Sequence, residues 1–300
     1  MKFLRFPGLW MCLLSISIPT FATSGFLYSG GAYTLVGPNY TDSSAFGIND
    51  SGQIVGYAAT GFLYSGGIYT NITYPGGRYT QALGINNAGQ ITGDYTDSQS
   101  LVEGFLLDHG TFSPINVPGA QTTIPIGINN NGQIAGQYVP EGQGQTYKGF
   151  LYSNGAYTTI YVPGSTATLG SGINDRGQIV GYYGDGQTYH GFLLSGGSYI
   201  TIDHPGAINT TALGINDLGQ IVGDYLDSNG LHGYLLCNGV FTDIDFPGAT
   251  KTTAIGINKY DDIVGRVYTT VPEPFSTTTM MLLGSGLVGV ASVGRRRLQR

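Results

Sequence analysis

The sequence predicts an all-β protein, a six-bladed β-propeller built from six repeats of about 42 residues. One motif, "GINDSGQIVGY" from Gly47, returns in variant form at Gly84, Gly127, Gly172, Gly214 and, in a degenerate copy, Gly256. A second motif, "GFLYSGGAYT" from Gly25, returns at Gly61, Gly104, Gly149, Gly191 and Gly233. A regular period of this length indicates a repeat architecture. Glycine makes up 50 of the 300 residues, which disfavours helices and suits short strands joined by tight turns.

Each repeat contains four predicted strands, and residues 212–246 show them most clearly. "ALGIN" and "QIVGDY" are short apolar strands separated by a glycine turn, and "HGYLLC" is a third strand. "NG" is a favoured hairpin turn, and "VFTDIDF" alternates between two faces as a fourth strand does. We expect an antiparallel meander with the "GIN" strand innermost, where small residues suit the crowded channel, and the fourth strand outermost.

The order of the motifs also predicts how the ring closes. The chain begins with the third and fourth strands of a repeat and finishes with the first and second. The last blade is then completed by both termini, which leaves no strand edge unpaired. The alternative is a β-solenoid, an open stack of the same units. Solenoids usually need capping units, and the sequence shows none.

The N-terminus has the layout of a secretory signal peptide over residues 1–22. Lys2 and Arg5 give a basic start, an apolar run extends from about Leu9 to Ile18, and residues 20–22 have the small–x–small form of a cleavage site. We therefore assign residues 24–270 to the repeat domain and exclude the leader from the fold.

The last segment, residues 271–300, is predicted to be a sorting signal. Residues 275–294 carry no charge over 20 positions, enough to span a bilayer as a helix, and the arginines that follow favour the cytoplasm. The sequence therefore predicts a C-terminal transmembrane helix. The segment resembles the PEP-CTERM sorting signal of Gram-negative bacteria through Val271, Pro272, Glu273, Pro274, the apolar stretch, and Arg295, Arg296 and Arg297. An ordinary C-terminal anchor is the alternative.

The resemblance to that signal has consequences for location and processing. It implies an exosortase as the processing partner, transient anchoring in the inner membrane, and a host that makes exopolysaccharide. We expect an exported protein that ends at the cell surface or outside the cell.

The repeat resembles the extracellular HAF family, named for a His-Ala-Phe triplet before the third strand. The "GINxxGQIVG" core is strong in five copies, and the resemblance covers nearly the whole body. The triplet itself is altered here, to His190-Gly191-Phe192, His232-Gly233-Tyr234 and Lys148-Gly149-Phe150. This resemblance implies an extracellular repeat protein and assigns no activity to it.

Charge and composition exclude several classes of function. The repeat body keeps 17 of the 18 acidic residues and 6 of the 12 basic ones, a net charge near −11, so nucleic acid is not an expected partner. Its one cysteine, Cys237, occupies a slot that other repeats fill with serine, and we interpret it as sequence drift and not as a nucleophile. The four histidines lack ligand spacing, so we expect no metal site and no cofactor.

We predict no catalytic residues. Asp94 and Asp224 share one slot of the repeat, and Asp203 and Asp245 share another, but an acid–base pair must converge across a cleft, which sequence does not show. The asparagine of each "GIN" is either part of a ring of ligands or a turn residue that bonds nearby backbone, and we favour the turn. These residues are Asn49, Asn86, Asn129, Asn174, Asn216 and Asn258.

One feature favours binding. The loops after the second and fourth strands are expected on one face, and they carry aromatic and acidic residues on a rigid scaffold. The candidate ligand-face residues are Tyr74, Tyr147, Tyr161, Tyr189, His204 and Phe246. Alternatively, the tyrosine rings pack between blades. We expect a non-enzymatic protein that binds exopolysaccharide or a surface protein. The alternatives are a hydrolase or lyase of exopolysaccharide and a purely structural matrix protein.

Overall fold

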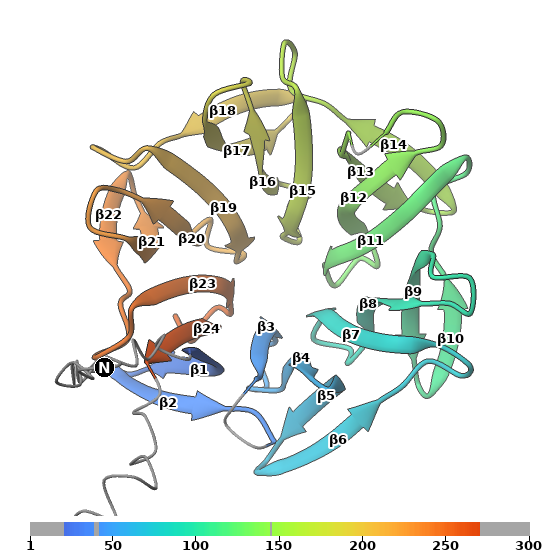
Figure 1. The fold of residues 1–300 in the computed structure, drawn as a ribbon, viewed down its shortest axis with the longest axis horizontal. Helices are drawn as coiled ribbons and strands as arrows, with labels where there is room; N and C mark the ends of the chain where they lie inside the picture. Colours follow the sequence, from blue (N-terminus) through green and yellow to red (C-terminus); the bar gives the residue numbers. More distant parts are fainter. Residues whose placement is uncertain (1–20, 39–41, 145, 271–300) are drawn as a thin grey trace, which may run out of the picture. The chain divides into compact units, whose positions relative to one another are not determined.

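All regular elements in the described part of the chain are β-strands. The computed structural model describes residues 21–38, 42–144 and 146–270 and contains 24 strands there. They are β1 (Phe21–Ser29), β2 (Ala32–Val36), β3 (Ser44–Ile48), β4 (Ile54–Ala58), β5 (Thr60–Ser65), β6 (Ile68–Ile72), β7 (Arg78–Ile85), β8 (Ile91–Thr96), β9 (Val102–Asp108), β10 (Thr111–Pro114), β11 (Ala120–Ile128), β12 (Ile134–Pro140), β13 (Lys148–Ser153), β14 (Ala156–Ile160), β15 (Ala167–Ile173), β16 (Ile179–Gly184), β17 (Tyr189–Ser195), β18 (Ser198–Ile202), β19 (Asn209–Ile215), β20 (Ile221–Leu226), β21 (Leu231–Cys237), β22 (Val240–Asp243), β23 (Lys251–Ile257) and β24 (Ile263–Thr270). The predicted all-β propeller is confirmed in general terms (Figure 1).

The strands hydrogen-bond into five sheets, which corrects the predicted count of six separate blades. Four sheets are four-stranded blades made of β3–β6, β7–β10, β11–β14 and β15–β18. The fifth has eight strands, in the order β19-β20-β21-β23-β24-β1-β2 with β22 paired to β21. A parallel bridge between Leu231 and Lys251 joins two repeats into this larger sheet. Motif spacing gives the number of repeats, but it does not show where neighbouring repeats bond to each other.

The ring closes through its two ends, as predicted. Strands β23 and β24 share one sheet with β1 and β2 from the other end of the chain. Asn258 Nδ2 donates to the backbone oxygen of Asn49 at 3.3 Å, across 209 residues of sequence. An open solenoid would not bring these residues together, so this alternative is excluded.

The predicted C-terminal transmembrane helix also requires correction. The described residues contain no helix, and therefore none long and apolar enough to cross a membrane. Residues 275–294, the sorting motif at 271–274 and the arginine cluster at 295–297 lie outside the described residues. The predicted leader also lies outside them, except for residues 21 and 22, which open β1.

The glycines of the "QIVG" motif are required by close strand contact. A Cβ on Gly181 would collide with the backbone oxygen of Leu169 and would lie 2.8 Å from the ring of Phe192. The same collision with the paired strand occurs at Gly56, Gly93, Gly136, Gly223 and Gly265. This glycine therefore leaves room for the outer end of the aromatic side chain of the third strand against the second strand in every repeat.

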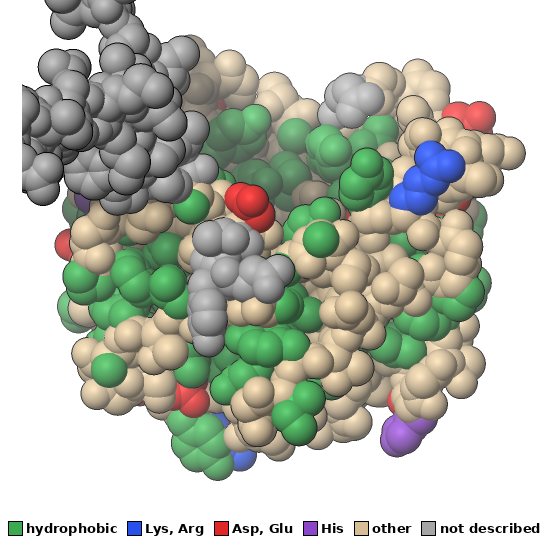
Figure 2. Space-filling view, turned by 60° about the horizontal axis from the view of Figure 1, so that its bottom comes forward, with side chains coloured by type: hydrophobic (Ala, Val, Ile, Leu, Met, Phe, Trp, Pro, Cys, Tyr) green, Lys and Arg blue, Asp and Glu red, His purple; other side chains and the backbone are tan. Residues whose placement is uncertain are grey.

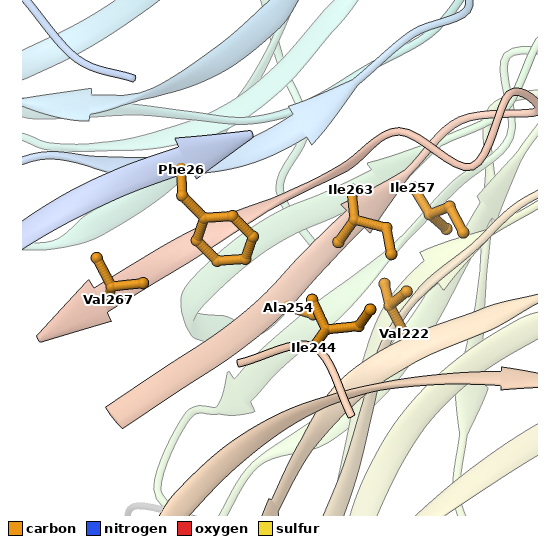
Figure 3. Close-up of a cluster of buried hydrophobic side chains, with 7 residues drawn as sticks. All are labelled: Phe26, Val222, Ile244, Ala254, Ile257, Ile263 and Val267. Atoms are coloured by element: carbon orange, nitrogen blue, oxygen red, sulfur yellow. The ribbon is translucent and has the colours of Figure 1, made fainter. Parts of the chain in front are cut away.

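The hydrophobic core lies between neighbouring repeats. The aromatic residue of each "GFL" motif is fully buried, and these residues are Phe26, Phe62, Phe105, Phe150, Phe192 and Tyr234. Figure 3 shows one cluster, in which Phe26 from β1 faces Ile263 and Val267 of β24 together with side chains of β20 and β23. Burying one such side chain contributes about 1.5–3 kcal/mol. Because each cluster draws on two repeats, a single repeat cannot form its own core.

Candidate functional site

One end of the central channel is organised by the "GIN" asparagines. Each Nδ2 donates to the backbone oxygen of the asparagine in the next repeat, as Asn129 does to Asn174 at 2.9 Å. The complete ring contains Asn49, Asn86, Asn129, Asn174, Asn216 and Asn258. The Oδ1 of Asn129 accepts from the backbone N–H groups of Asn131 and Gln133. These bonds fix the turn and join the repeats, which supports the turn interpretation over a ring of ligands.

The middle of the channel is a constriction. A cavity of about 80 Å³ is lined there mostly by glycine and apolar residues of the innermost strands, including Gly84, Ile85 and Ile126. A Cβ on Gly84 would collide with the backbone oxygen of Ile126 in the next repeat. Neighbouring innermost strands therefore approach too closely for a larger side chain at this glycine.

The other end of the channel widens into a cavity of about 420 Å³, which we call the wide-mouth cavity. Its apolar lining comes from the innermost strands and includes Phe46, Leu83, Ile124, Ile126, Leu213 and Ile255. Its polar lining is Gln81, Asp94, Gln137, Ser171, Tyr182, Thr253 and Arg266. A smaller cavity of about 270 Å³ shares Tyr182, Leu213 and Arg266 with it and adds Tyr189 and Asp224.

The polar lining is concentrated at one slot of the repeat, the residue after the glycine of "QIVG". In chain order this slot holds Tyr57, Asp94, Gln137, Tyr182, Asp224 and Arg266. All but the half-buried Tyr57 line the two cavities. The glycine before it is constant and a tyrosine follows it in four of the six repeats, whereas this position changes in charge and shape from repeat to repeat. A constant framework that presents different polar groups to one cavity is the arrangement expected of a recognition site.

Sequence reasoning missed this constellation. The prediction noted that Asp94 and Asp224 share a slot but found no residues that break the repeat around a common point. The available signal was the variability of the position after "QIVG" within an otherwise constant motif. This variability can be interpreted as a binding site only once the structure shows that the ring brings the six positions to the same end of the channel.

Burial perturbs the ionisable groups of the cavity. Asp94 is 5% exposed and has no hydrogen-bond or ion-pair partner among the described residues. Loss of solvation raises the pKa of Asp94 to about 7. Burial also raises the pKa of Asp224, against the hydrogen bond from Thr211 at 2.5 Å and the positive charge of Arg266. Burial raises the pKa of Tyr182 to about 12, so its hydroxyl remains a proton donor.

Three of the predicted ligand-face residues have a packing role. Tyr74 stacks on Tyr95 of the next repeat at 3.6 Å with an interplanar angle of 6°. His204 stacks in the same way on Tyr225, at 3.7 Å and 2°. Phe246 lies among the rings of the last repeat, 5.4 Å from that of Tyr33. These three side chains connect consecutive repeats, as the alternative interpretation proposed.

The other three predicted residues differ in their surroundings. Tyr189 is 48% exposed, lines the smaller cavity and contacts the ring of Tyr182 at 5.8 Å. Tyr147 is half-buried, and its phenol acts electrostatically on Tyr182. Tyr161 is 45% exposed, and its hydroxyl donates to the backbone oxygen of Ser165. Tyr147 and Tyr189 thus lie near the wide-mouth cavity.

The histidine of the altered triplet is one member of a cross-strand pair. His190 Nδ1 lies 2.9 Å from Asp203, and His232 Nδ1 lies 2.7 Å from Asp245. In other repeats the same spacing of 13 residues joins Thr60 to Thr73 and Glu103 to Asn116. The residue 13 positions later therefore changes together with the residue at the histidine position. This pattern indicates that the pair stabilises the packing of the two strands. No group of three or more His, Cys, Asp or Glu side chains in the described residues is placed to hold a metal.

Cys237 makes the same contact as the serine at the equivalent position of another repeat. Gln220 Nε2 lies 3.8 Å from its Sγ, and Gln178 makes the equivalent contact with Ser195 at 3.1 Å. The cysteine thus substitutes for a serine in a repeated contact.

Comparison with known proteins supports the fold and does not assign a family. No protein-family model matches the chain. No curated protein matches its sequence. The structure is similar to "putative TolB" from Agrobacterium tumefaciens, with a TM-score of 0.65 and 11% identity over 84% of this chain and 100% of that one. It is also similar to TolB from Acinetobacter baumannii, with a TM-score of 0.53 and 13% identity over 82% of this chain and 63% of that one. At these identities the likeness shows a shared propeller fold alone.

Proposed function

We propose that this chain is an exported, non-enzymatic repeat protein that binds a glycan or a protein at the cell surface or in the extracellular matrix. The observation that carries this proposal is the slot after "QIVG", which directs different polar side chains from successive repeats into the wide-mouth cavity. Exposed tyrosines at 161 and 189 add ring faces and hydroxyl groups suited to carbohydrate. Charged side chains are sparse in the view of Figure 2, which favours recognition through hydrogen bonds and apolar contact.

Export and sorting are part of the proposal and rest on the sequence. The leader-like residues 1–22 support secretion, and the resemblance of residues 271–300 to the PEP-CTERM signal supports processing by an exosortase. Removing residues 271–300 is expected to release the body into the medium, whereas the full chain is retained at the cell surface. Surface display that is unchanged by this truncation would refute the sorting part of the proposal.

Binding is tested by calorimetric titration of purified residues 23–270 with exopolysaccharide from the host. This span contains the described strands, apart from the first two residues of β1, and the contacts that close the ring. We expect saturable binding that weakens in the variant Tyr161→Ala/Tyr189→Ala. The matched control is Tyr260→Ala, because Tyr260 is 63% exposed and lies in the turn beside the asparagine ring. Absence of saturable binding to exopolysaccharide or to surface proteins would favour a purely structural matrix role.

A specific observation also favours a second candidate, a hydrolase or lyase acting on exopolysaccharide. Asp94, whose pKa is raised to about 7 by burial, and Asp224 line adjoining cavities. Glycoside hydrolysis commonly uses one carboxyl group that stays protonated and another that is ionised. Release of new reducing ends or of unsaturated sugars during the titration, abolished by Asp94→Asn, would establish this activity in place of simple binding.

A further inference from the structure

We propose that the wide-mouth cavity receives the terminal sugar unit of a glycan chain, an inference that rests on the proposed glycan-binding function. The innermost strands surround the channel (Figure 1), and the cavity at its middle level, about 80 Å³, is much smaller than the wide-mouth cavity of about 420 Å³. A chain that fills the wide-mouth cavity therefore finds little room beyond it, which favours entry with one end first. An internal stretch of the same chain could instead contact the outer loops.

Two polar groups of the cavity lack partners and point to a ligand. Asp94 is 5% exposed and has no hydrogen-bond partner among the described residues, and Arg266 Nε is buried without one. Buried polar groups are nearly always hydrogen-bonded, so such a group calls for an explanation. Both residues line the wide-mouth cavity. A ligand here must offer hydrogen-bond donors and acceptors at several points, as the hydroxyl groups of one sugar ring do.

The charges of the cavity favour an uncharged ligand. The ionisable groups that line it are Asp94, Arg266 and Tyr182, and Asp224 lines the adjoining smaller cavity. The positive charge of Arg266 acts on both Asp224 and Tyr182. Arg266 and Asp224 offset each other, and burial disfavours the ionised forms of Asp94 and Tyr182. No strong net charge is left to select an anion or a cation.

The deeper wall of the cavity is apolar. It is formed by innermost-strand side chains such as Phe46, Leu83 and Ile126. A pyranose ring presents C–H groups on its faces and hydroxyl groups around its edge. It can therefore place a face or its C–H groups on this wall while the hydroxyls meet the polar slot residues. An amino acid or a small inorganic anion would satisfy only part of this lining.

The test compares polymer, chain ends and free sugars with the same protein. Residues 23–270 are titrated with host exopolysaccharide before and after partial acid hydrolysis, which multiplies chain ends at constant mass. A panel of free neutral monosaccharides, glycine and inorganic phosphate is titrated alongside. We expect the binding capacity per gram of polysaccharide to rise with the number of chain ends, and at least one free monosaccharide to compete.

Variants locate the site within the cavity. Asp94→Asn is expected to weaken binding of short chains by up to about tenfold, the usual effect of losing one hydrogen bond of about 0.5–1.5 kcal/mol. Ser171→Leu introduces the residue found at the same slot in two other repeats and fills part of the cavity, so it should also weaken binding. Asp261→Asn, an exposed carboxylate in a turn, is the matched control. Melting curves establish that each variant folds.

The possible results separate this inference from the proposed function. Capacity that stays constant on hydrolysis, together with full binding by both cavity variants, would overturn the chain-end proposal while leaving glycan binding by the outer loops intact. Binding of glycine or phosphate with no binding of sugars would overturn the assigned ligand class. No binding of any polysaccharide preparation would refute the glycan part of the proposed function and the chain-end inference with it.

Discussion

Replacing Asp94 by asparagine should stabilise the protein at alkaline pH, because the wild type then ionises a buried carboxyl group without a partner. Burial raises the pKa of Asp94 from 3.8 to about 7 in the folded state. Each unit of pKa corresponds to about 1.4 kcal/mol, so ionised Asp94 destabilises the fold by about 4 kcal/mol, to order of magnitude. The folded state binds the proton more tightly than the unfolded state. Wild-type stability therefore falls as pH rises from about 4 to 7, and the loss is complete above that range.

The variant removes this titration and keeps the side-chain volume. We expect Asp94→Asn to melt about 8–16 °C above wild type at pH 8.5, since 1 kcal/mol shifts the melting temperature of a chain this long by about 2–4 °C. The advantage should shrink towards zero near pH 4. Any fixed effect of the asparagine amide is the same at both pH values, so the change with pH is the quantity to compare.

Thermal unfolding of residues 23–270, followed by circular dichroism between pH 4 and 9, measures this difference. Asp261→Asn removes one exposed negative charge and controls for the net charge of the protein. A difference between Asp94→Asn and wild type that does not vary with pH would refute the reasoning. It would mean that Asp94 is solvated or paired in the folded protein.

Three further outcomes are expected. Asn129→Ala loses its hydrogen bond to the next repeat and the backbone bonds of its own turn, so the free energy of unfolding measured in urea should fall by about 1–3 kcal/mol, and no change would contradict the role of the ring. Gly181→Ala should prevent stable folding because its Cβ meets a backbone carbonyl, whereas Gly196→Asn, at a turn with φ of 57° where other repeats carry asparagine, should fold normally in solubility and melting assays. The hydrogen bond to its aspartate partner raises the pKa of His232, so the stability it contributes is present below about pH 6.5 and lost as pH rises through the raised value. His232→Gln should therefore lower the melting temperature by up to about 4 °C at pH 5.5 and less at pH 8.5, and an equal loss at both would reject the ion pair.

Local repetition in the sequence was sufficient to predict most of the architecture. Four strands per repeat, their order from the channel outward, and closure by both termini all follow from motifs that specify strands and turns over a few residues. The count of separate sheets was wrong because one bridge, from Leu231 to Lys251, merges two repeats. Such a bridge depends on how closely two strand ends approach in space, and the local sequence around these two residues does not predict it.

The candidate site shows the limit of reasoning along the chain. Aromatic residues before "PG" suggested a ligand face, yet Tyr74 and His204 stack on the next repeat. A tyrosine that packs and a tyrosine that binds have the same local sequence, and only their neighbours distinguish them. The slot after "QIVG" was overlooked for the opposite reason, since its residues look unrelated until the ring assembles them.

The sequence by itself determined the repeat, its strands and the turn-forming role of the "GIN" asparagines, because these depend on backbone preferences within a few residues. Only the tertiary structure decided which polar groups meet. Asp94 and Arg266 are 172 positions apart in the chain, and they line one cavity because ring closure brings the same slot of each repeat to the same end of the channel. The burial that raises the pKa of Asp94 arises from that assembly, and no single repeat contains it.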